Sequence, residues 1–214
     1  ENYFISKLKL FSELKVSKTA VINLDDSYAK RICVATPARV ITYGMNQQAD
    51  IHPIESKFSI NGIDAKLIFG NKELMIRSNL VGEYNLSNII SASAVSLVMG
   101  IPTYKIEQTI SNLPPIPGRL EQIACNCPGK VFIDYAHTPD AYEKLFSTLT
   151  KLKGEKDKII TVFGCGGDRD TEKRHKMAQI SEAYSAISYI TSDNPRTEPL
   201  NQIIADIAHG FSGS

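Results

Sequence analysis

The sequence predicts an α/β protein in two parts, because strands and helices alternate differently in its two halves. In the second half, a short apolar run, a polar loop and a segment of helical spacing follow one another three times. The apolar runs are Val131–Asp134, Lys158–Phe163 and Ala186–Thr191, and the last has the composition of a buried strand. Repeated strand–helix units favour a parallel, doubly wound sheet of the Rossmann type. The first half alternates β-rich runs with turn residues, which predicts β-hairpins beside a few helices.

The elements of the first half follow from their periodicity. It predicts, in chain order, a helix at Tyr3–Leu14, a strand at Thr19–Leu24, short strands between Arg39 and Ile76, and helices at Ile89–Met99 and Thr103–Asn112. Asn61-Gly62 and Gly70-Asn71 are typical hairpin turns within the β-rich part. Gly82–Asn88 opens the first of the two later helices. The strands are too few for a complete α/β layer, so this half is predicted to be the back part of a larger domain.

The proline-rich segment Leu113–Gly118 separates the two halves. Proline neither continues a helix nor donates to a sheet, so the segment predicts a linker, with domains at residues 1–114 and 115–214. The helices of the second domain are predicted at Pro139–Leu152, Lys173–Tyr184 and Pro199–Gly210. Thr138 is a natural N-cap for the first of them, and Pro139 suits the first helical position.

The composition excludes several classes of protein. The 214 residues carry 24 basic and 23 acidic side chains, a net charge of +1, which shows no bias toward nucleic acid or acidic membranes. No apolar run is long enough to cross a membrane, and the first residues do not have the pattern of a signal peptide. The cysteines, Cys33, Cys125, Cys127 and Cys165, have no metal-binding spacing and are predicted to be reduced thiols. A cytoplasmic protein that binds neither nucleic acid nor membrane is therefore expected.

The loop Asp193–Arg196 is the most informative stretch of the chain. It stands between a predicted strand and a predicted helix, and ligands of open α/β sheets bind at the carboxyl ends of the strands. The planar guanidinium of Arg196 can hold a carboxylate through two parallel hydrogen bonds. A capped, proline-bearing turn with a solvated arginine is the alternative, since turn chemistry alone explains Asp, Asn and Pro. The loops Tyr135–Asp140 and Gly164–Asp170 follow the other two strands, so all three loops are expected at one edge of the sheet.

Two common nucleotide-binding motifs are missing from the sequence. Its only Gly-Lys pair, Gly129-Lys130, is followed by Val131 and has Ala124 where the first glycine of a phosphate-binding loop belongs. Gly164–Arg169 begins like a dinucleotide fingerprint but ends in arginine rather than glycine. NAD and FAD are therefore not expected as cofactors.

Several motifs together resemble the Mur ligases of peptidoglycan synthesis, in particular the branch that adds a diamino acid as the third peptide residue. The matching motifs occur in family order and are Tyr3–Lys7, Gly82–Asn88, Pro117–Glu121, Asp134–Asp140, Gly164–Asp170 and Asp193–Arg196. The resemblance implies that the chain is an internal fragment. Residues 1–114 would be the C-terminal part of the central, ATP-binding domain, and residues 115–214 the front part of the C-terminal, amino-acid-binding domain.

The resemblance implies an ATP-dependent ligase that joins an acid to an amino acid. In the expected reaction the γ-carboxylate of UDP-N-acetylmuramoyl-L-alanyl-D-glutamate is phosphorylated by ATP, and the amine of meso-2,6-diaminopimelate attacks the acyl phosphate. Mg²⁺ and basic side chains neutralise the developing charge. The enzyme is expected to be a monomer, and this piece alone to be inactive. The alternatives are an L-lysine-adding or folylpolyglutamate-type ligase, and a non-catalytic Mur-ligase-like interaction module.

The resemblance also implies roles for individual residues. Lys7 corresponds to a lysine that the family carbamylates to make an anionic Mg²⁺ ligand; otherwise it is a solvated helix lysine. The residues expected at ATP are Asn88, Arg119, Asp134 and His137. The residues expected at diaminopimelate are Arg169, Asp193, Asn194, Pro195 and Arg196. Asp168 and Asp170 are expected to brace Arg169 or to cap the following helix.

Overall fold

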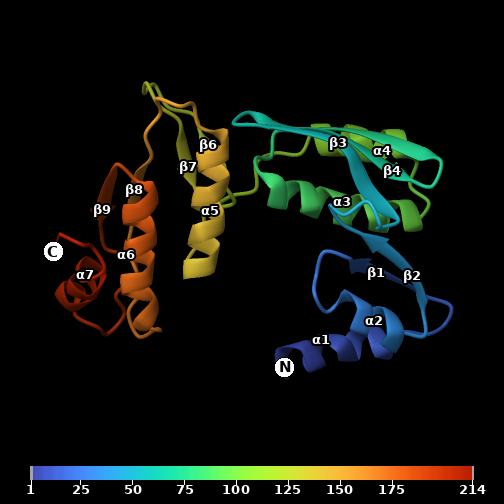
Figure 1. The fold of residues 1–214 in the computed structure, drawn as a ribbon, viewed down its shortest axis with the longest axis horizontal. Coiled ribbons are helices and arrows are strands. Elements are labelled where there is room, and N and C mark those ends of the chain that lie inside the picture. Colours follow the sequence, from blue (N-terminus) through green and yellow to red (C-terminus); the bar gives the residue numbers. More distant parts are fainter. Residues whose placement is uncertain (1, 214) are drawn as a thin grey trace. The chain divides into compact units, whose positions relative to one another are not determined.

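The computed structural model describes residues 2–213, and the chain divides into two compact units between Ile116 and Pro117 (Figure 1). Unit 1 contains α1 (Asn2–Ser12), β1 (Thr19–Asn23), α2 (Ala29–Ala35), β2 (Arg39–Tyr43), β3 (Ile51–Ser59), β4 (Gly62–Phe69), β5 (Lys72–Ser78), α3 (Glu83–Val98) and α4 (Thr103–Ser111). Unit 2 contains β6 (Glu121–Ile123), β7 (Val131–Ile133), α5 (Pro139–Leu152), β8 (Ile160–Phe163), α6 (Glu172–Tyr184), β9 (Ile187–Ile190) and α7 (Leu200–Ala208). The predicted α/β class is confirmed.

Unit 1 is built on one five-stranded sheet in the order β1-β2-β3-β4-β5. Strands β1, β2 and β3 run parallel, whereas β3–β4 and β4–β5 are the antiparallel hairpins that the turn residues predict. Gly62 opens β4 with a φ of 147°, and a Cβ there would overlap the carbonyl oxygen of Ser78 on β5. Glycine is therefore required at this turn, and it places Ser59 opposite Gly62 in the hairpin register.

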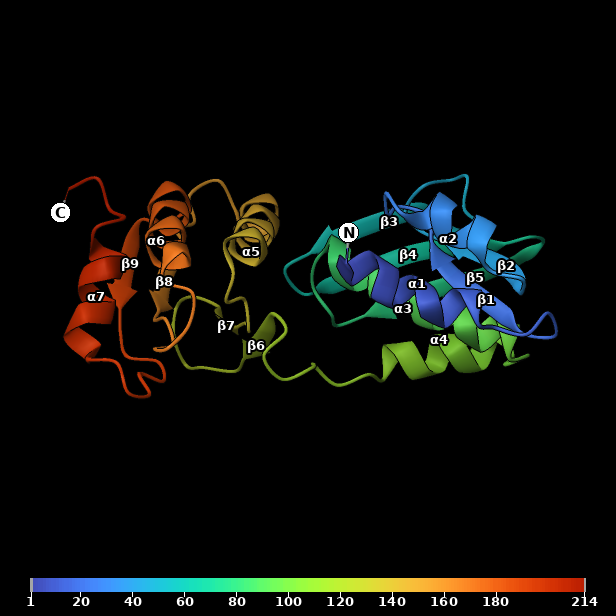
Figure 2. The same cartoon turned by 90° about the horizontal axis from the view of Figure 1, so that it is seen from below.

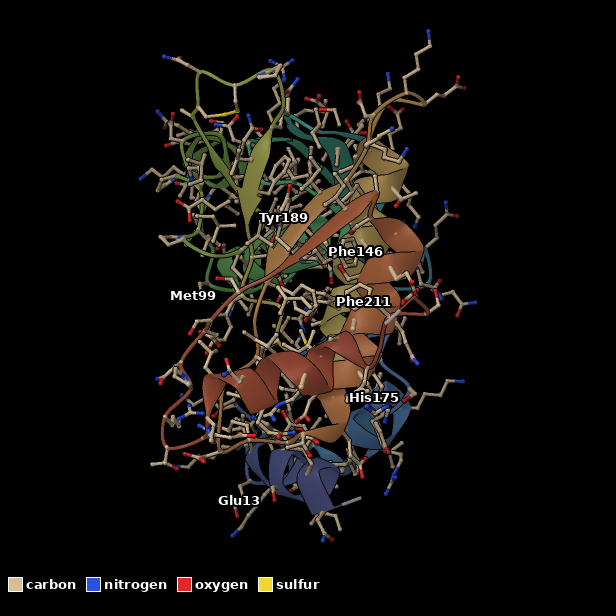
Figure 3. All side chains as sticks on the ribbon, turned by 90° about the vertical axis from the view of Figure 1, so that its left-hand side faces the viewer. Glu13, Met99, Phe146, His175, Tyr189 and Phe211 are labelled. Carbon is tan, nitrogen blue, oxygen red and sulfur yellow. A yellow bond between two sulfur atoms is a disulfide. The ribbon has the colours of Figure 1, made fainter. Side chains whose placement is uncertain are left out.

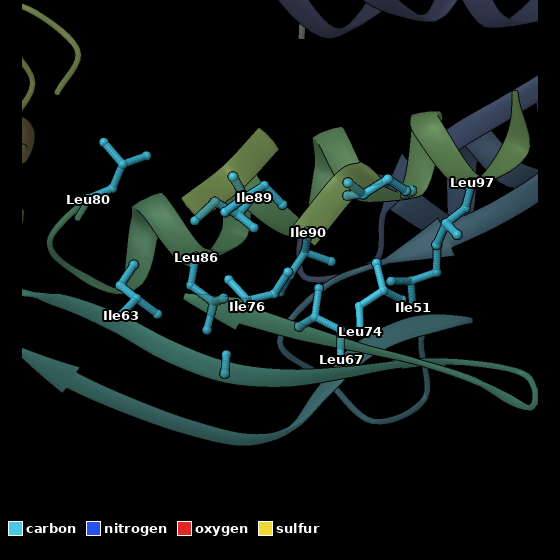
Figure 4. Close-up of a cluster of buried hydrophobic side chains, with 14 of the residues drawn as sticks. Ile51, Ile63, Leu67, Leu74, Ile76, Leu80, Leu86, Ile89, Ile90 and Leu97 are labelled. Carbon is cyan, nitrogen blue, oxygen red and sulfur yellow. The ribbon is translucent and has the colours of Figure 1, made fainter. Parts of the chain in front are cut away.

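The main core of unit 1 lies between this sheet and the helices α3 and α4 (Figure 4). Burial alternates along β5, where Leu74 and Ile76 face inward, as expected for a strand with one covered face. On α3, Leu86, Ile90 and Ala94 recur every four residues and are fully buried. This spacing places them on one side of the helix, which faces the strands.

Helix α3 begins at Glu83 rather than at the predicted Ile89. Gly82 stands at its N-cap with a φ of 95°, and Asn85 already lies in the first turn with its side chain buried. The Nδ2 group of Asn85 donates to the carbonyl oxygen of Val81 at 2.8 Å. The motif Gly82–Asn88, which the sequence predicts to open the helix, therefore forms its first turns.

Helix α2 is an element of unit 1 that the sequence pattern does not predict. It has seven residues, and Ala29 at its start packs in a second core cluster with Ala20 and Ile22 of β1. At its other end Val34 is 89% exposed. Two turns of helix are not stable in isolation, so packing against β1 stabilises this one.

Unit 2 has a different strand arrangement from the one that the sequence predicts. Strand β7 pairs with β6 in an antiparallel hairpin, and β8 pairs with β9 in parallel (Figure 2). The predicted parallel sheet is therefore correct for β8 and β9, whereas β7 has its hydrogen-bonding partner in β6. Strand β6 has only three residues, too few to give a periodic signal.

The prediction of a buried third strand is wrong for the described part of unit 2. The core of this unit gathers Phe163 of β8 with Phe146 of α5, Met177 of α6 and Ile203 of α7 on one face of the strands. The side chains on the other face of β8 and β9 are exposed, and they are Ile160, Val162, Ile187 and Tyr189. Figure 3 labels Phe146 of the core and Tyr189 of the exposed face. Burial depends on the neighbouring layers, which the composition of a strand does not reveal.

Helix α5 begins where the sequence predicts. The hydroxyl oxygen of Thr138 accepts the N–H of Ala141 at 3.3 Å, and Pro139 occupies the first helical position.

The prediction that all cysteines are reduced is wrong for one pair. Cys125 and Cys127 form a disulfide in the exposed turn between β6 and β7, visible as the yellow bond in Figure 3.

Candidate functional site

The polar loops that follow β8 and β9 lie directly against each other. The N–H of Gly167 donates to the carbonyl oxygen of Asn194 at 2.9 Å, and Nη1 of Arg196 donates to the carbonyl oxygen of Gly167 at 2.5 Å. A Cβ on Gly167 would overlap the carbonyl oxygen of Pro195. Glycine at this position therefore lets the two backbones touch. The expectation that all three polar loops share one edge of a sheet is confirmed for these two, whereas the loop after β7 follows a strand of a different sheet.

Asp168 adds a side-chain connection between the same loops. Its carboxylate accepts the N–H of Thr197 at 3.0 Å and the hydroxyl of Thr197 at 2.7 Å. These bonds lower the pKa of Asp168 below its usual value. Asp168 thus binds the neighbouring loop rather than Arg169. Asp170 accepts the N–H of Glu172, the first residue of α6, at 2.9 Å, whereas the N-cap position is Thr171, which makes no side-chain cap bond.

A buried arginine, Arg174 of α6, connects both loops to α7. Its two terminal nitrogens donate to the two carboxylate oxygens of Glu198 at 2.6 Å each. Nη1 also donates to Asp206 at 2.7 Å, and Nη2 donates to the carbonyl oxygen of Gly166 at 3.3 Å. The guanidinium lowers the pKa of Glu198 to about 2 and lowers that of Asp206 as well. Sequence reasoning misses Arg174, because it stands among the charged residues 172–175 and nothing local signals its burial.

The residues predicted to bind diaminopimelate all lie in this pair of loops. The side chains of Arg169, Asp193, Asn194 and Arg196 are exposed, and Pro195 is partly buried. Oδ1 of Asn194 accepts the N–H of Arg196 at 3.2 Å and so supports the turn locally. Two guanidinium groups beside a carboxylate and an amide suit a ligand that carries both carboxylates and ammonium groups.

A second group of side chains gathers around Asp134, at the end of β7. Oδ2 of Asp134 accepts the N–H of Leu120 at 2.7 Å, and Oδ1 accepts the N–H of Ala136 at 2.8 Å. The N–H of Tyr135 donates to the carbonyl oxygen of Gly118 at 2.8 Å. Asp134 therefore fixes the segment that carries Arg119 beside the loop after β7.

Arg119 and His137 both lie against Tyr135. The guanidinium carbon of Arg119 is 5.2 Å from the centroid of the tyrosine ring, and the imidazole centroid of His137 is 5.1 Å from it. All three side chains are exposed. Flat rings beside a positive charge suit a base or a phosphate of a nucleotide. Tyr135 is a candidate that sequence reasoning does not single out, although it stands within the motif after β7.

The loop after β7 is also tied to α6. Nζ of Lys173 donates to the carbonyl oxygen of His137 at 2.9 Å. Lys173 stands next to Arg174, so the first turn of α6 contacts the loop after β7 and, through Gly166 and Glu198, the two loops that carry the amino-acid candidates. Sequence reasoning also misses Lys173, which looks like an ordinary solvated lysine.

The remaining predicted residues, Lys7 and Asn88, belong to unit 1. Lys7 is exposed on α1, with Nζ 5.4 Å from the ring centroid of Tyr3. Asn88 is exposed on α3, and its Nδ2 group donates to Oδ1 of Asn85 at 3.5 Å. Lys7 is therefore accessible to carbon dioxide, while Asn88 is partly engaged in its own helix.

Within residues 2–213, no three His, Cys, Asp or Glu side chains gather closely enough to hold a metal ion. Magnesium takes six oxygen ligands in octahedral geometry, several of them waters or substrate phosphates. A carbamate on Lys7 would supply only one anionic group, so the described residues do not by themselves make a magnesium site.

The chain matches two family models: the Mur ligase middle domain over residues 1–96 and the Mur ligase glutamate ligase domain over residues 118–213. It is 40% identical to the UDP-N-acetylmuramoyl-L-alanyl-D-glutamate–2,6-diaminopimelate ligase of Chlamydia muridarum, over 99% of this chain and 44% of that protein. The ligase of the same name from Fusobacterium nucleatum is 40% identical over 99% of this chain and 43% of that protein. The chain thus spans less than half the length of the curated relatives it matches.

Solved structures of the family have a similar fold. A structure of a UDP-N-acetylmuramoyl-L-alanyl-D-glutamate–2,6-diaminopimelate ligase matches with a TM-score of 0.66 and 32% identity over 99% of this chain and 44% of that one. MurF from Acinetobacter baumannii matches with a TM-score of 0.75 at 16% identity, over 97% of this chain and 44% of that one. The folylpolyglutamate synthase of Mycobacterium tuberculosis matches with a TM-score of 0.70 at 20% identity, over 90% of this chain and 43% of that one. No helix in the described residues is both long and apolar enough to cross a membrane.

Proposed function

This chain belongs to the Mur ligase family, and we propose that it is part of an enzyme that adds meso-2,6-diaminopimelate to UDP-N-acetylmuramoyl-L-alanyl-D-glutamate with ATP. The names of relatives about 40% identical to it support this substrate choice. The observation that carries the proposal is the contact between the loops after β8 and β9, which brings Arg169 and Arg196 to one edge of the sheet. The activity is proposed for the full-length parent, since the chain spans 44% of one such relative.

We place diaminopimelate at these two loops because their arginines can bind the carboxylate that distinguishes it from lysine. Diaminopimelate differs from lysine by one carboxylate on its distal carbon, so an enzyme that distinguishes the two must bind that group. Arg196 and Arg169 offer two planar forks for the carboxylates. Asp193 and Asn194 can accept hydrogen bonds from the ammonium groups. These contacts orient the attacking amine toward the acyl phosphate.

We assign the nucleotide to the group around Tyr135. Bound ATP supplies the phosphoryl group that activates the γ-carboxylate of the substrate. Arg119 and His137 would contact the nucleotide, and Asp134 would hold the segment of Arg119. The Mycobacterium tuberculosis folylpolyglutamate synthase, whose structure was determined with ADP and AMPPCP, supports nucleotide use by this fold.

Three further assignments complete the proposal. Lys7 is carbamylated in the full-length enzyme, where groups outside this chain complete a magnesium site. The enzyme acts as a monomer, and it acts in the cytoplasm.

The proposal is tested by Arg196→Ala in the full-length parent. Arg196 is exposed in this chain, and the proposal is that bound diaminopimelate buries the pair in the full-length enzyme. The variant should then use diaminopimelate about 30-fold less efficiently or worse, because removing one partner of a buried charge pair costs about 2–5 kcal/mol. Arg196→Lys should restore only part of the efficiency, since an ammonium group cannot form two parallel bonds. The KM for ATP should not change. Steady-state kinetics with each substrate varied in turn provide the measurement.

Arg77→Ala is a suitable control for this variant. Arg77 is an exposed arginine of β5 whose Nε lies 4.0 Å from Asp64, and such exposed pairs contribute little. Its removal should leave both KM values unchanged. If Arg196→Ala instead weakens ATP binding and leaves the KM for diaminopimelate unchanged, the loop has been assigned to the wrong ligand. Turnover with lysine or glutamate in place of diaminopimelate would favour one of the other ligases, and no turnover at all would favour the interaction module.

A further inference from the structure

The two exposed loops of the proposed amino-acid site share one buried cation. The side chain of Arg174 is 0% exposed, whereas its partners Glu198 and Asp206 keep 19% and 27% exposure. A buried guanidinium is costly unless it is paired and fully hydrogen-bonded. Nη1 and Nη2 of Arg174 are paired with these carboxylates, whereas its Nε has no hydrogen-bond partner among the described residues. The two carboxylates are the charged partners of this buried cation, so charge-assisted bonds hold them in place.

Glu198 differs from Asp206 in its other contacts. Oε2 of Glu198 also accepts the N–H of Asp168 at 3.0 Å, in the loop after β8. The N–H of Glu198 donates to the carbonyl oxygen of Pro195 at 3.0 Å, in its own loop. Asp206 instead accepts a bond from Gln202 at 2.8 Å within α7. Glu198, unlike Asp206, therefore joins Arg174 to both loops, beside the direct bond from Arg174 to the carbonyl oxygen of Gly166.

The backbone of both loops needs this support. Asp168 has a φ of 52° and Arg196 a φ of 51°, in the left-handed region that non-glycine residues rarely adopt. Such a residue keeps its conformation only where surrounding bonds outweigh the strain. Asp168, the strained residue of the loop after β8, donates the N–H that Glu198 accepts. Arg196, the strained residue of the loop after β9, carries the guanidinium proposed to bind the ligand.

We propose that Glu198 is a positioning residue for amino-acid recognition, because it fixes the loop of Arg169 relative to the loop of Arg196. The inference rests on the proposed function, in which both guanidinium groups bind carboxylates of one diamino acid. Cations on separate loops can bind the two ends of one small molecule only if the loops stay in place. Glu198 does this without touching the ligand.

Backbone hydrogen exchange tests the positioning role independently of turnover. Glu198→Gln and Asp206→Asn each remove one charged partner of Arg174, but only the first weakens the bond to Asp168. The N–H of Asp168 should exchange about tenfold faster or more in Glu198→Gln, as expected for a lost charge-assisted bond, and stay within about twofold in Asp206→Asn. Unchanged exchange in Glu198→Gln, or equal acceleration in both variants, overturns the proposal.

A second variant covers the case in which Glu198→Gln does not fold. Glu198→Asp keeps the charge beside Arg174 but shortens the side chain, so that it no longer reaches both Arg174 and the N–H of Asp168. It should show the same faster exchange at Asp168. Protection equal to that of the wild type in this variant would refute the role of Glu198.

Kinetics of the full-length enzyme test the consequence for recognition. Glu198→Gln should raise the KM for diaminopimelate about tenfold, leave the KM for ATP unchanged, and reduce the preference for diaminopimelate over lysine. Asp206→Asn should lower the melting temperature with no change in either KM. An equal rise in KM in both variants would show a general loss of stability and refute positioning. A wild-type enzyme that rejects diaminopimelate refutes the proposed function instead, and the exchange result then decides the role of Glu198.

Discussion

At the residue scale, the charge of Glu198 links the stability of unit 2 to pH. Arg174 lowers the pKa of Glu198 to about 2 from an ordinary value of 4.5. Between these values the unfolded chain binds more protons than the folded chain, so stability increases with pH there. The contribution of Glu198 is complete above the unfolded pKa and is lost as the pH falls through the folded one. We expect the urea midpoint of unfolding to decrease as the pH falls from about 4.5 to about 2.

The Glu198→Gln variant provides the comparison for this pH dependence. Its side chain does not titrate, so the decrease over the acidic window should be smaller than in the wild type. The decrease of the urea midpoint should not vanish in this variant, because folding also lowers the pKa values of Asp168 and Asp206, which still titrate. Identical pH profiles for the two proteins would mean that Glu198 is not held by Arg174 in solution.

At the scale of the element, the start of α5 depends on one hydroxyl group. Thr138 accepts the N–H of Ala141 at 3.3 Å, which satisfies one of the unpaired donors of the first turn. Thr138→Ala should lower the free energy of unfolding by about 1 kcal/mol. Thr150→Ala is the matched control, since Thr150 is exposed inside the same helix and alanine has the higher helix propensity. Urea unfolding of both variants measures the difference, and an equal effect would argue against a capping role.

At the scale of the whole molecule, the chain has two compact units, and its two halves match the middle and glutamate ligase domains of the Mur ligases. Its sequence has no Gly-x-x-x-x-Gly-Lys-Ser/Thr motif to hold the phosphates of ATP. We therefore expect the purified 214-residue chain to release no ADP when it is given ATP, magnesium, the UDP-linked dipeptide and diaminopimelate. The full-length parent under the same conditions is the positive control. Robust ATP-dependent ligation by the chain alone would show that the active site lies elsewhere.

Much of the element order follows from local chemistry alone. The turns at Asn61-Gly62 and Gly70-Asn71 form the two hairpins of unit 1, because glycine and asparagine accept backbone angles that close a turn. Thr138 and Pro139 start α5 as predicted. The motifs of the three polar loops also identify the family. All these signals lie within a few neighbouring residues, so they can be read before the chain folds.

Burial and pairing were decided only by the tertiary structure. The partner of β7 is β6, the outer face of β8 and β9 is exposed, and Arg174 is fully buried. For the candidate site, the sequence indicates the loops that carry Arg169 and Arg196, whereas the tertiary structure shows that Glu198 joins them. The physical reason is that strand pairing and desolvation depend on segments far apart in the chain. A charged residue gives no local sign that distant carboxylates will surround it.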